Sequence, residues 1–269
     1  MWQGDGVDPS EAPERGTTVQ SLARGLSVIT AFDAEHPVMS VSDIARRTGL
    51  ARAVVARFVR TLEDLGYLRG DGRRFALTPR VLELGFSYLS ALSLPEIAQP
   101  HLEMLSASVH ESASASVLDG ADIVYVARVP TQRIMSLRIS IGTRFPAVTT
   151  SMGRVLLAAL PVDRVDAVLG DTEVAPRTPR TIVDGRLLRV ELERVREQGY
   201  ALVDEELEVG LRSIAVPVRR GPNGLIVAAI NVSTASARYL PDAMIAELLP
   251  PLLGAAERIG ADLAGARGL

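Results

Sequence analysis

Arginines that could contact nucleic acid are concentrated in one short stretch of the chain. Between Asp43 and Glu63 there are five basic residues and no acidic one, namely Arg46, Arg47, Arg52, Arg57 and Arg60. Guanidinium groups reach base edges or phosphates, and the small residues Ala53 and Ala56 would let a helix backbone approach a groove closely. The simpler alternative is a solvated helix face, but such faces usually mix both signs of charge. The pattern therefore predicts DNA binding.

The charge balance of the surrounding region supports this interpretation. Residues 18–80 contain ten arginines and six acidic residues, whereas the whole chain has a net charge of −3. Arg69, Arg73 and Arg74 extend the basic stretch beyond the helices. A basic region inside an acidic chain is typical of a nucleic-acid surface.

The elements around these arginines predict a winged helix-turn-helix over residues 18–78. Ser40 or Ser42 can cap a first helix, and Gly49 supplies the turn to a second helix over residues 51–65. Asp71-Gly72 marks a hairpin turn between two strands, the wing. The second helix is expected to bury Val55, Phe58 or Val59, Leu62 and Leu65. An earlier helix over residues 18–32 is expected to pack onto both through Val19, Leu22, Leu26 and Ile29.

Length and composition limit the remaining possibilities. A chain of 269 residues with 47% hydrophobic content fits two domains with real cores. Residues 1–17 are polar and rich in Gly and Pro, and we expect a disordered tail. No apolar run approaches the roughly 20 residues that cross a bilayer and no signal segment is evident, so we expect a cytoplasmic protein without a membrane partner. The absence of cysteine and lysine excludes thiolate metal sites, P-loops and Schiff-base chemistry.

Residues 79–94 predict a linker helix that dimerises. Thr78 and Pro79 favour a helix start, and the segment carries more apolar side chains than a single exposed helix tolerates. These side chains are Val81, Leu82, Leu84, Phe86, Tyr88, Leu89 and Leu92. The same helix in a second subunit is the simplest partner, and packing on the C-terminal domain of the same chain is the alternative.

Residues 95–269 predict an α+β domain, a sandwich on an antiparallel sheet. Short β-rich segments separated by Gly, Asp and Pro alternate with helices that begin near Pro95, Ser151 and Gly185. The segment FPAVTT at 145–150 is expected to be a strand, and GPNG at 221–224 a hairpin turn. The last helix is expected to kink or break at Pro250-Pro251.

This second domain carries no pattern for catalysis. Its histidines, with the third at His36, are scattered without metal-ligand spacing, and no GxSxG or GxGxxG motif is present. We therefore expect no enzyme, no metal site and no cofactor. Small polar residues among apolar ones favour a ligand pocket instead, with Ser151, Ser213, Asn231 and Ser233 as its orienting groups. The N–H groups of residues 151–153 could hold a carboxylate, and the alternative is that each polar group is satisfied within the core.

Taken together and in order, several segments resemble the IclR family of transcriptional regulators over roughly residues 18–265. They include VQSLARGLSVITAF, DIARRTGL, VRTLEDLGYL, TSMGRVLLAAL and GYALVDEELEVGLRSIAVPV. Within the family, RIMSLRISIGTRFPAVTTSMGRVLLA and VDEELEVGLRSIAVPV most resemble the β-ketoadipate-pathway regulators of aromatic-acid catabolism. The resemblance implies a C-terminal GAF-like α/β sandwich that binds a small organic, and in this group aromatic, carboxylate. It also implies homodimers, or dimers of dimers, on palindromic double-stranded operators.

Carried over by position, the family's effector site falls on residues from several elements. They are Ser151, Met152, Asp204, Ser213, Asn231 and Ser233, with Leu137 and Ile139 as wall residues. Family members often carry Ser or Thr at the start of the recognition helix, where Ala51 here loses a cap worth ~1 kcal/mol. A polar residue is also common where Val203 stands, so the polar end of the site is expected at Asp204.

These features lead to a hypothesis for the mechanism. Two helices over residues 51–63 would enter successive major grooves, with half-sites about one helical turn apart. Arg52, Ala53, Ala56 and Arg57 would face bases, while phosphates would be contacted by Arg46, Arg47, Arg60, Arg73 and Arg74. An effector carboxylate would pair with one of Arg128, Arg133, Arg138 and Arg144, and bias the dimer through residues 79–94. Two alternatives remain open: a small-molecule-binding or enzymatic domain beside a module that does not bind DNA, and a winged-helix scaffold for protein partners.

Overall fold

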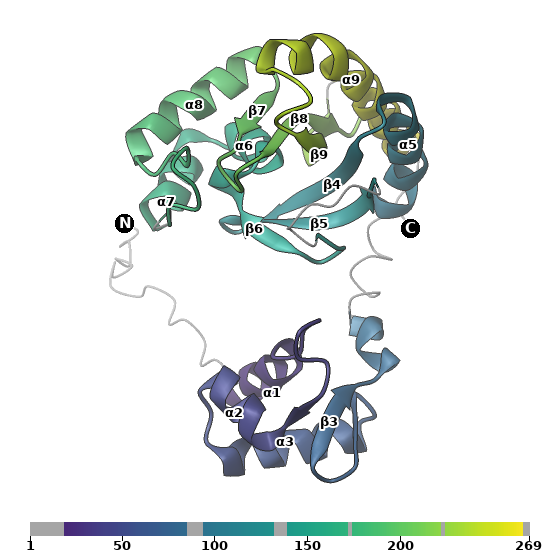
Figure 1. Ribbon diagram of the computed structural model, residues 1–269, viewed down its shortest axis with the longest axis vertical. Coiled ribbons are helices and arrows are strands. Elements are labelled where there is room, and N and C mark those ends of the chain that lie inside the picture. The colour runs from purple at the N-terminus through teal and green to yellow at the C-terminus, as the bar shows by residue number, and fades with distance from the viewer. Residues whose placement is uncertain (1–18, 85–93, 132–138, 172–173, 222–223, 266–269) are drawn as a thin grey trace, which may run out of the picture. The chain divides into compact units, whose positions relative to one another are not determined.

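The computed structural model describes residues 19–84, 94–131, 139–171, 174–221 and 224–265 (Figure 1). The chain divides into two compact units between Tyr88 and Leu89, and each unit has its own hydrophobic core. The tail predicted for residues 1–17, most of the predicted linker helix and the predicted wall residue Leu137 lie outside the described residues.

The N-terminal unit is the predicted winged helix-turn-helix. Its elements are α1 (Gln20–Thr30), β1 (Met39–Ser40), α2 (Val41–Thr48), α3 (Arg52–Asp64), β2 (Leu68–Gly70) and β3 (Arg74–Leu77). Ser40 caps α2, because its hydroxyl accepts the Asp43 N–H at 3.3 Å while Asp43 Oδ2 accepts the Ser40 N–H at 3.1 Å. Gly49 ends α2 with φ 70°, a left-handed conformation that glycine adopts without strain. The short strand β1, which adds to the wing in the order β1-β3-β2, has no clear sequence signal.

Helix α1 forms where predicted but buries a different face. Val28 and Ala31 point into the core, whereas Val19, Leu22 and Leu26 are 64%, 63% and 47% exposed. At about 100° per residue, the exposed three lie on the side of the helix away from Val28. The expectation that Val19, Leu22 and Leu26 pack on α2 and α3 is therefore wrong, whereas Ile29, expected with them, is partly buried against this core. The sequence of α1 contains two apolar faces, and only the tertiary partners decide which one is buried.

The C-terminal unit is the predicted α+β fold on one antiparallel sheet, with strand order β6-β5-β4-β9-β8-β7. Its strands are β4 (Ser112–Asp119), β5 (Asp122–Val129), β6 (Arg144–Pro146), β7 (Ala201–Asp204), β8 (Leu211–Arg219) and β9 (Ile226–Ala235). Its helices are α5 (Leu94–Val109), α6 (Ser151–Ala158), α7 (Val162–Asp171), α8 (Gly185–Gln198) and α9 (Pro241–Gly265).

Helices cover both faces of this sheet (Figure 1). Helices α5 and α9 pack on one face, where Leu102 and Leu252 meet Ile230 in one core cluster. Helices α6 and α8 pack on the other face around Leu157. Because side chains alternate along a strand, β9 directs Ile230 toward α5 and α9 and Asn231 toward α6. The second core is therefore the one that holds polar groups.

Three local features of this unit differ from the sequence prediction. The segment expected as a strand at 145–150 continues β6 only to Pro146 and then forms a 3-10 turn over Ala147–Thr149, because proline offers no N–H to extend the sheet. Helix α9 runs unbroken through Pro250 and Pro251, since buried residues on both sides, including Leu248 and Leu252, hold it against the sheet. Helix α7 was not predicted at all.

Only the start of the predicted linker helix lies within the described residues. Pro79–Val81 forms a 3-10 turn, and Thr78 Oγ1 accepts the Arg80 N–H at 3.3 Å. Residues 82–84 are helical, and the side chains of Leu82 and Leu84 are exposed within this unit. The segment from 85 to 93 lies outside the described residues.

Candidate functional site

Helix α3 presents the predicted DNA-contacting residues on one exposed face. Val55, Val59 and Leu62 anchor the neighbouring face in the core, whereas Leu65, expected beside them, is exposed just beyond the helix end. At about 100° per residue, an arc of about 140° holds all five residues assigned to this face, namely Arg52, Ala53, Ala56, Arg57 and Arg60. Among the described residues, none of these three arginines has an ion-pair partner, so their charges are available to an outside phosphate or base.

The start of α3 lacks the hydroxyl cap that the sequence also lacks. Ala51 takes the N-cap position in an extended conformation, and no side chain caps the helix there. Arg52 follows at the first helical position and is exposed. A phosphate could satisfy the free N–H groups at this helix start.

The two arginines of α2 are held by neighbouring acids. Arg46 Nη2 lies 2.5 Å from Asp43 Oδ1, and Arg47 Nη2 lies 2.5 Å from Asp33 Oδ2. His36 Nδ1 is 3.0 Å from Asp33 Oδ1, and this hydrogen bond together with the charge of Arg47 lowers the pKa of Asp33. A phosphate would have to compete with these carboxylates, so we expect Arg46 and Arg47 to contribute less than the arginines of α3.

The wing is turned tightly at Asp71 and Gly72, as predicted. Asp71 Oδ1 accepts the N–H groups of Arg73 and Arg74 at 2.8 and 2.7 Å, and these hydrogen bonds lower the pKa of Asp71. Gly72 has φ 83°. The turn leaves the side chains of Arg73 and Arg74 exposed at the tip, where a DNA backbone or minor groove could be reached.

In the C-terminal unit, polar side chains gather on the sheet face that α6 covers. We call this surface the serine face; it comprises Ser112, Ser114, Ser116, Ser213, Asn231 and Ser233, which the sheet register places on one side. The start of α6 touches it twice, because Ser151 Oγ lies 2.9 Å from Ser213 Oγ and Ser116 Oγ donates to Met152 Sδ at 3.3 Å. The structure thus brings together five of the residues predicted to bind an effector, namely Ser151, Met152, Ser213, Asn231 and Ser233.

Two other predicted effector residues have different surroundings. Asp204 is paired with Arg212 in the sheet register, so it lies on the face opposite to Ser213. Its Oδ1 accepts from Arg212 Nε at 2.7 Å, and its Oδ2 accepts from Arg180. Asp204 therefore orders Arg212 instead of supplying the polar end of the serine face. Ile139 is half-buried against the apolar cluster that includes the buried residues of α6.

Four arginines were predicted as partners of an effector carboxylate, and the structure describes two of them. Arg144 is engaged with Asp119 at 2.7 Å and Asp122 at 3.3 Å. Arg128, which stands opposite Ser114 on the serine face, donates from Nη1 to Ser114 Oγ at 3.1 Å and has no acidic partner among the described residues. Burial lowers the pKa of Arg128. Arg133 and Arg138 lie outside the described residues.

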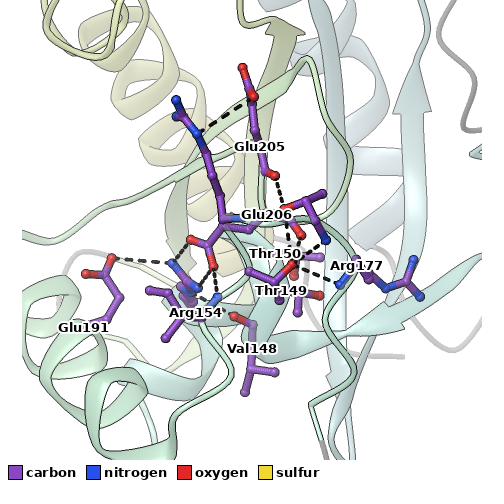
Figure 2. Close-up of polar contacts among 12 residues, drawn as sticks. Val148, Thr149, Thr150, Arg154, Arg177, Glu191, Glu205 and Glu206 are labelled. Atoms are coloured by element: carbon purple, nitrogen blue, oxygen red, sulfur yellow. Dashed lines mark hydrogen bonds and ion pairs between the residues drawn. The ribbon is translucent and has the colours of Figure 1, made fainter.

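Figure 2 shows a buried ion pair between Arg154 and Glu206 that the sequence does not predict. Arg154 lies one helical turn along α6 from Ser151. Arg154 is 1% exposed, and its Nη1 and Nη2 donate to Glu206 Oε1 and Oε2 at 2.7 and 2.6 Å. Its Nε donates to the Val148 carbonyl at 2.9 Å, and Glu191 Oε1 lies 3.7 Å from Nη1. An arginine directly before the apolar run VLLAAL gives no sequence signal of such a partner.

The same ion pair organises the loop after β7. Ile182 N–H donates to Glu206 Oε2 at 3.0 Å. Thr178 Oγ1 and Thr181 Oγ1 donate to the carbonyls of Glu205 and Glu206 at 2.6 and 2.7 Å. Residues 178–182, the loop at 205–206 and the start of α6 are therefore joined around one buried charge pair.

Within the described residues, no group of histidine and acidic side chains is arranged to hold a metal ion. No helix in the same part of the chain is both long enough and apolar enough to span a membrane.

Two family models match the chain. One, described as the IclR helix-turn-helix domain, matches residues 21–72. The other, described as the C-terminal part of the bacterial transcriptional regulator IclR, matches residues 86–261. Together they span both units.

Individual relatives agree with these matches. The Pca regulon regulatory protein of Pseudomonas putida is 44% identical, over 91% of this chain and 84% of its own length. The p-hydroxybenzoate hydroxylase transcriptional activator of Acinetobacter baylyi is 37% identical, over 90% of each chain. A crystal structure of an IclR homologue from Microbacterium hydrocarbonoxydans complexed with 4-hydroxybenzoate has a TM-score of 0.80 and 27% identity, and covers 91% of this chain and 100% of that chain. The two sequence relatives are regulatory proteins and not enzymes.

Proposed function

Because the chain belongs to the IclR family of transcriptional regulators, we propose that it binds a palindromic operator and that a small aromatic carboxylate controls this binding. The observation that carries the proposal is the face of α3, where three exposed arginines flank two alanines and have no acidic partner within the described part of the chain. A protein that binds bacterial operator DNA works in the cytoplasm.

The proposed DNA contacts follow from the exposure of each side chain. Arg52 and Arg57, with Ala53 and Ala56 between them, face base edges in the major groove. Arg60 of α3 and the wing arginines neutralise phosphates, which supplies affinity without sequence preference. Arg46 and Arg47 are secondary phosphate contacts, since Asp43 and Asp33 already engage them.

A homodimer is proposed because a palindromic operator requires two copies of α3. Leu82 and Leu84, at the start of the linker segment, are exposed within their own unit. The outer face of α1 adds Val19, Leu22 and Leu26, whose spacing of three and four residues suits pairing with a second helix. Dimers can associate further into dimers of dimers on DNA.

The effector is proposed to lie between the serine face and the start of α6. Its polar groups meet Ser151, Ser213 and Ser233, while Met152 and Ile139 contribute apolar walls. An aromatic acid is favoured because one relative is named for p-hydroxybenzoate hydroxylase and a similar structure holds 4-hydroxybenzoate. Binding would favour one of two dimer arrangements through residues 79–94, and so change operator affinity.

A footprint on the gene's own upstream region, repeated with a panel of aromatic acids, tests the proposal. We expect protection of two half-sites about one helical turn apart, and an acid-dependent change in protein concentration for half-protection. An enzymatic domain beside an inert N-terminal module, or a winged-helix scaffold for proteins, would leave no sequence-specific footprint. A footprint that no acid alters would support operator binding but contradict its control by an aromatic carboxylate.

A further inference from the structure

Two buried polar atoms on the serine face have no hydrogen-bond partner among the described residues. They are Arg128 Nε on β5 and Asn231 Oδ1 on β9. Ser114 of β4 stands opposite both residues in the sheet register, so the three side chains form one row across three neighbouring strands. Buried polar groups are normally satisfied, and leaving one unsatisfied is costly. Two unsatisfied groups in one row indicate a place where another molecule completes the hydrogen bonding.

Arg128, which is half-buried, differs from the buried arginines Arg154 and Arg212 in having no counter-charge within the described chain. Arg154 is paired with Glu206, and Arg212 is paired with Asp204. The guanidinium of Arg128 contacts the neutral hydroxyl of Ser114 instead. A partly desolvated guanidinium that lacks a carboxylate beside it is stabilised by an anion from outside the chain.

The surroundings of this row suit an anion that carries a flat apolar body. Tyr125 stands opposite Ser116 in the register, and its ring meets that of Phe145 edge-on at a centroid distance of 6.0 Å. Burial raises the pKa of Tyr125 to about 12, so its phenol is neutral at ordinary pH and does not repel an anion. Met152 of α6 contacts Ser116 and adds a polarisable apolar surface above the sheet.

We propose that Arg128, together with Ser114 and Asn231, binds the carboxylate of the effector. This inference rests on the proposed function, because it assigns one end of the effector to one row of the sheet. The Asn231 amide can turn to present its N–H donors, while Arg128 offers Nε and a free Nη. The start of α6 is a poorer carboxylate site, since Thr150 Oγ1 already accepts the Gly153 N–H at 3.1 Å. The carboxylate therefore lies toward β5, and the other end of the effector lies toward Ser151 and Ser213.

Calorimetric titration of the full-length protein with 4-hydroxybenzoate and with its neutral analogue 4-hydroxybenzamide tests this assignment. The wild type should prefer the acid. Arg128→Met should weaken acid binding at least about tenfold, as expected for loss of a charge-assisted contact, and should remove the preference over the amide. Arg144→Met is the matched control, because Arg144 is already paired with Asp119 and Asp122, and its acid affinity should stay within about threefold of wild type.

A second variant distinguishes the loss of the carboxylate contact from a folding defect. Asn231→Asp places a carboxylate in the row, where it would pair with Arg128 and exclude the acid while the melting temperature holds or rises. Retention of wild-type acid affinity by both Arg128→Met and Asn231→Asp would overturn the inference and leave the proposed function intact. A wild-type protein that binds no acid of the panel would overturn both the inference and the effector half of the proposed function. The footprint without acid would then still decide DNA binding separately.

Discussion

Arg154→Met tests the role of the buried ion pair in holding the effector domain together. Methionine keeps the unbranched apolar part of the side chain but has neither charge nor donors, so the variant removes both hydrogen bonds to Glu206 and the one to the Val148 carbonyl. Glu206 would keep only the Ile182 N–H at 3.0 Å among these contacts and would remain a buried, uncompensated charge. Breaking a buried pair in this way costs about 3–5 kcal/mol of unfolding free energy.

The loss should be visible in thermal unfolding of the full chain followed by circular dichroism. For a unit of this size, about 2–4 °C of melting temperature is lost per kcal/mol, so the transition of the C-terminal unit should fall by about 6–20 °C. Arg189→Met is the control, because Arg189 and Asp166 form an ion pair at 2.7 Å that is about half exposed. Exposed pairs contribute at most about 1 kcal/mol, so this variant should lose a few degrees at most.

A double variant separates the charge effect from the loss of packing. In Arg154→Met/Glu206→Leu the uncompensated carboxylate is gone, so part of the stability should return, although Ile182 N–H then loses its acceptor. If Arg154→Met and Arg189→Met lower the melting temperature of the C-terminal unit equally, the ion pair does not hold α6 to the loop after β7.

Three further outcomes are expected. Arg57→Ala should weaken operator binding about 5- to 150-fold and relax base preference in a gel-shift series, whereas Arg189→Ala should change neither; unchanged binding would remove Arg57 from the interface. Ser213→Leu should abolish the acid response of the footprint without altering the footprint itself, and an intact response would mean that the effector site lies elsewhere. Hydrogen bonds from Ser40 lower the pKa of Asp43 below its usual 3.8, so this carboxylate stabilises the N-terminal unit above that value and the contribution is lost as pH falls below it. Asp43→Asn should therefore flatten the acid limb of the unfolding curve below about pH 3.8, and an unchanged limb would contradict the capping role.

Local signals explain why the N-terminal unit could be predicted so fully. Gly49 and Asp71-Gly72 require particular turns, and the helical spacing of Val55, Val59 and Leu62 identifies the buried face of α3. The orientation of α1 could not be predicted, because Val19, Leu22 and Leu26 form as regular a stripe as the residues that are buried. The choice between the two faces depends on contacts with α2 and α3, which helical periodicity does not encode.

Tertiary packing also overrides local preference in the C-terminal unit. Two consecutive prolines in α9 predict a kink or a break, and the helix does not break because its apolar residues are held against the sheet and α5. The loss of two backbone hydrogen bonds is a local cost, whereas the packing that offsets it comes from residues distant in sequence.

The sequence indicates which polar side chains share a face at the candidate effector site, but not which of the nearby charged groups are paired. The strand alternation places Ser213, Asn231 and Ser233 on one face, as their positions suggested. Which acids neutralise which arginines could not be foreseen, because ion-pair partners are brought together by the fold. Asp204 proved to be engaged with Arg212, while Arg128 proved to be without an acidic partner among the described residues.

Operator affinity measured against salt concentration, with and without 4-hydroxybenzoate, tests whether the arginines of α3 and the wing bind DNA and whether an aromatic acid controls this binding. If Arg60, Arg73 and Arg74 each neutralise one phosphate in both protomers, the logarithm of the association constant should fall with the logarithm of salt at a slope of about −5. At any one salt concentration, the acid should change the association constant while the slope stays the same. The reason is that the acid changes the arrangement of the dimer and not the number of phosphate contacts. A slope near zero would contradict DNA binding through these arginines, and an association constant that no aromatic acid changes would contradict control by a carboxylate effector.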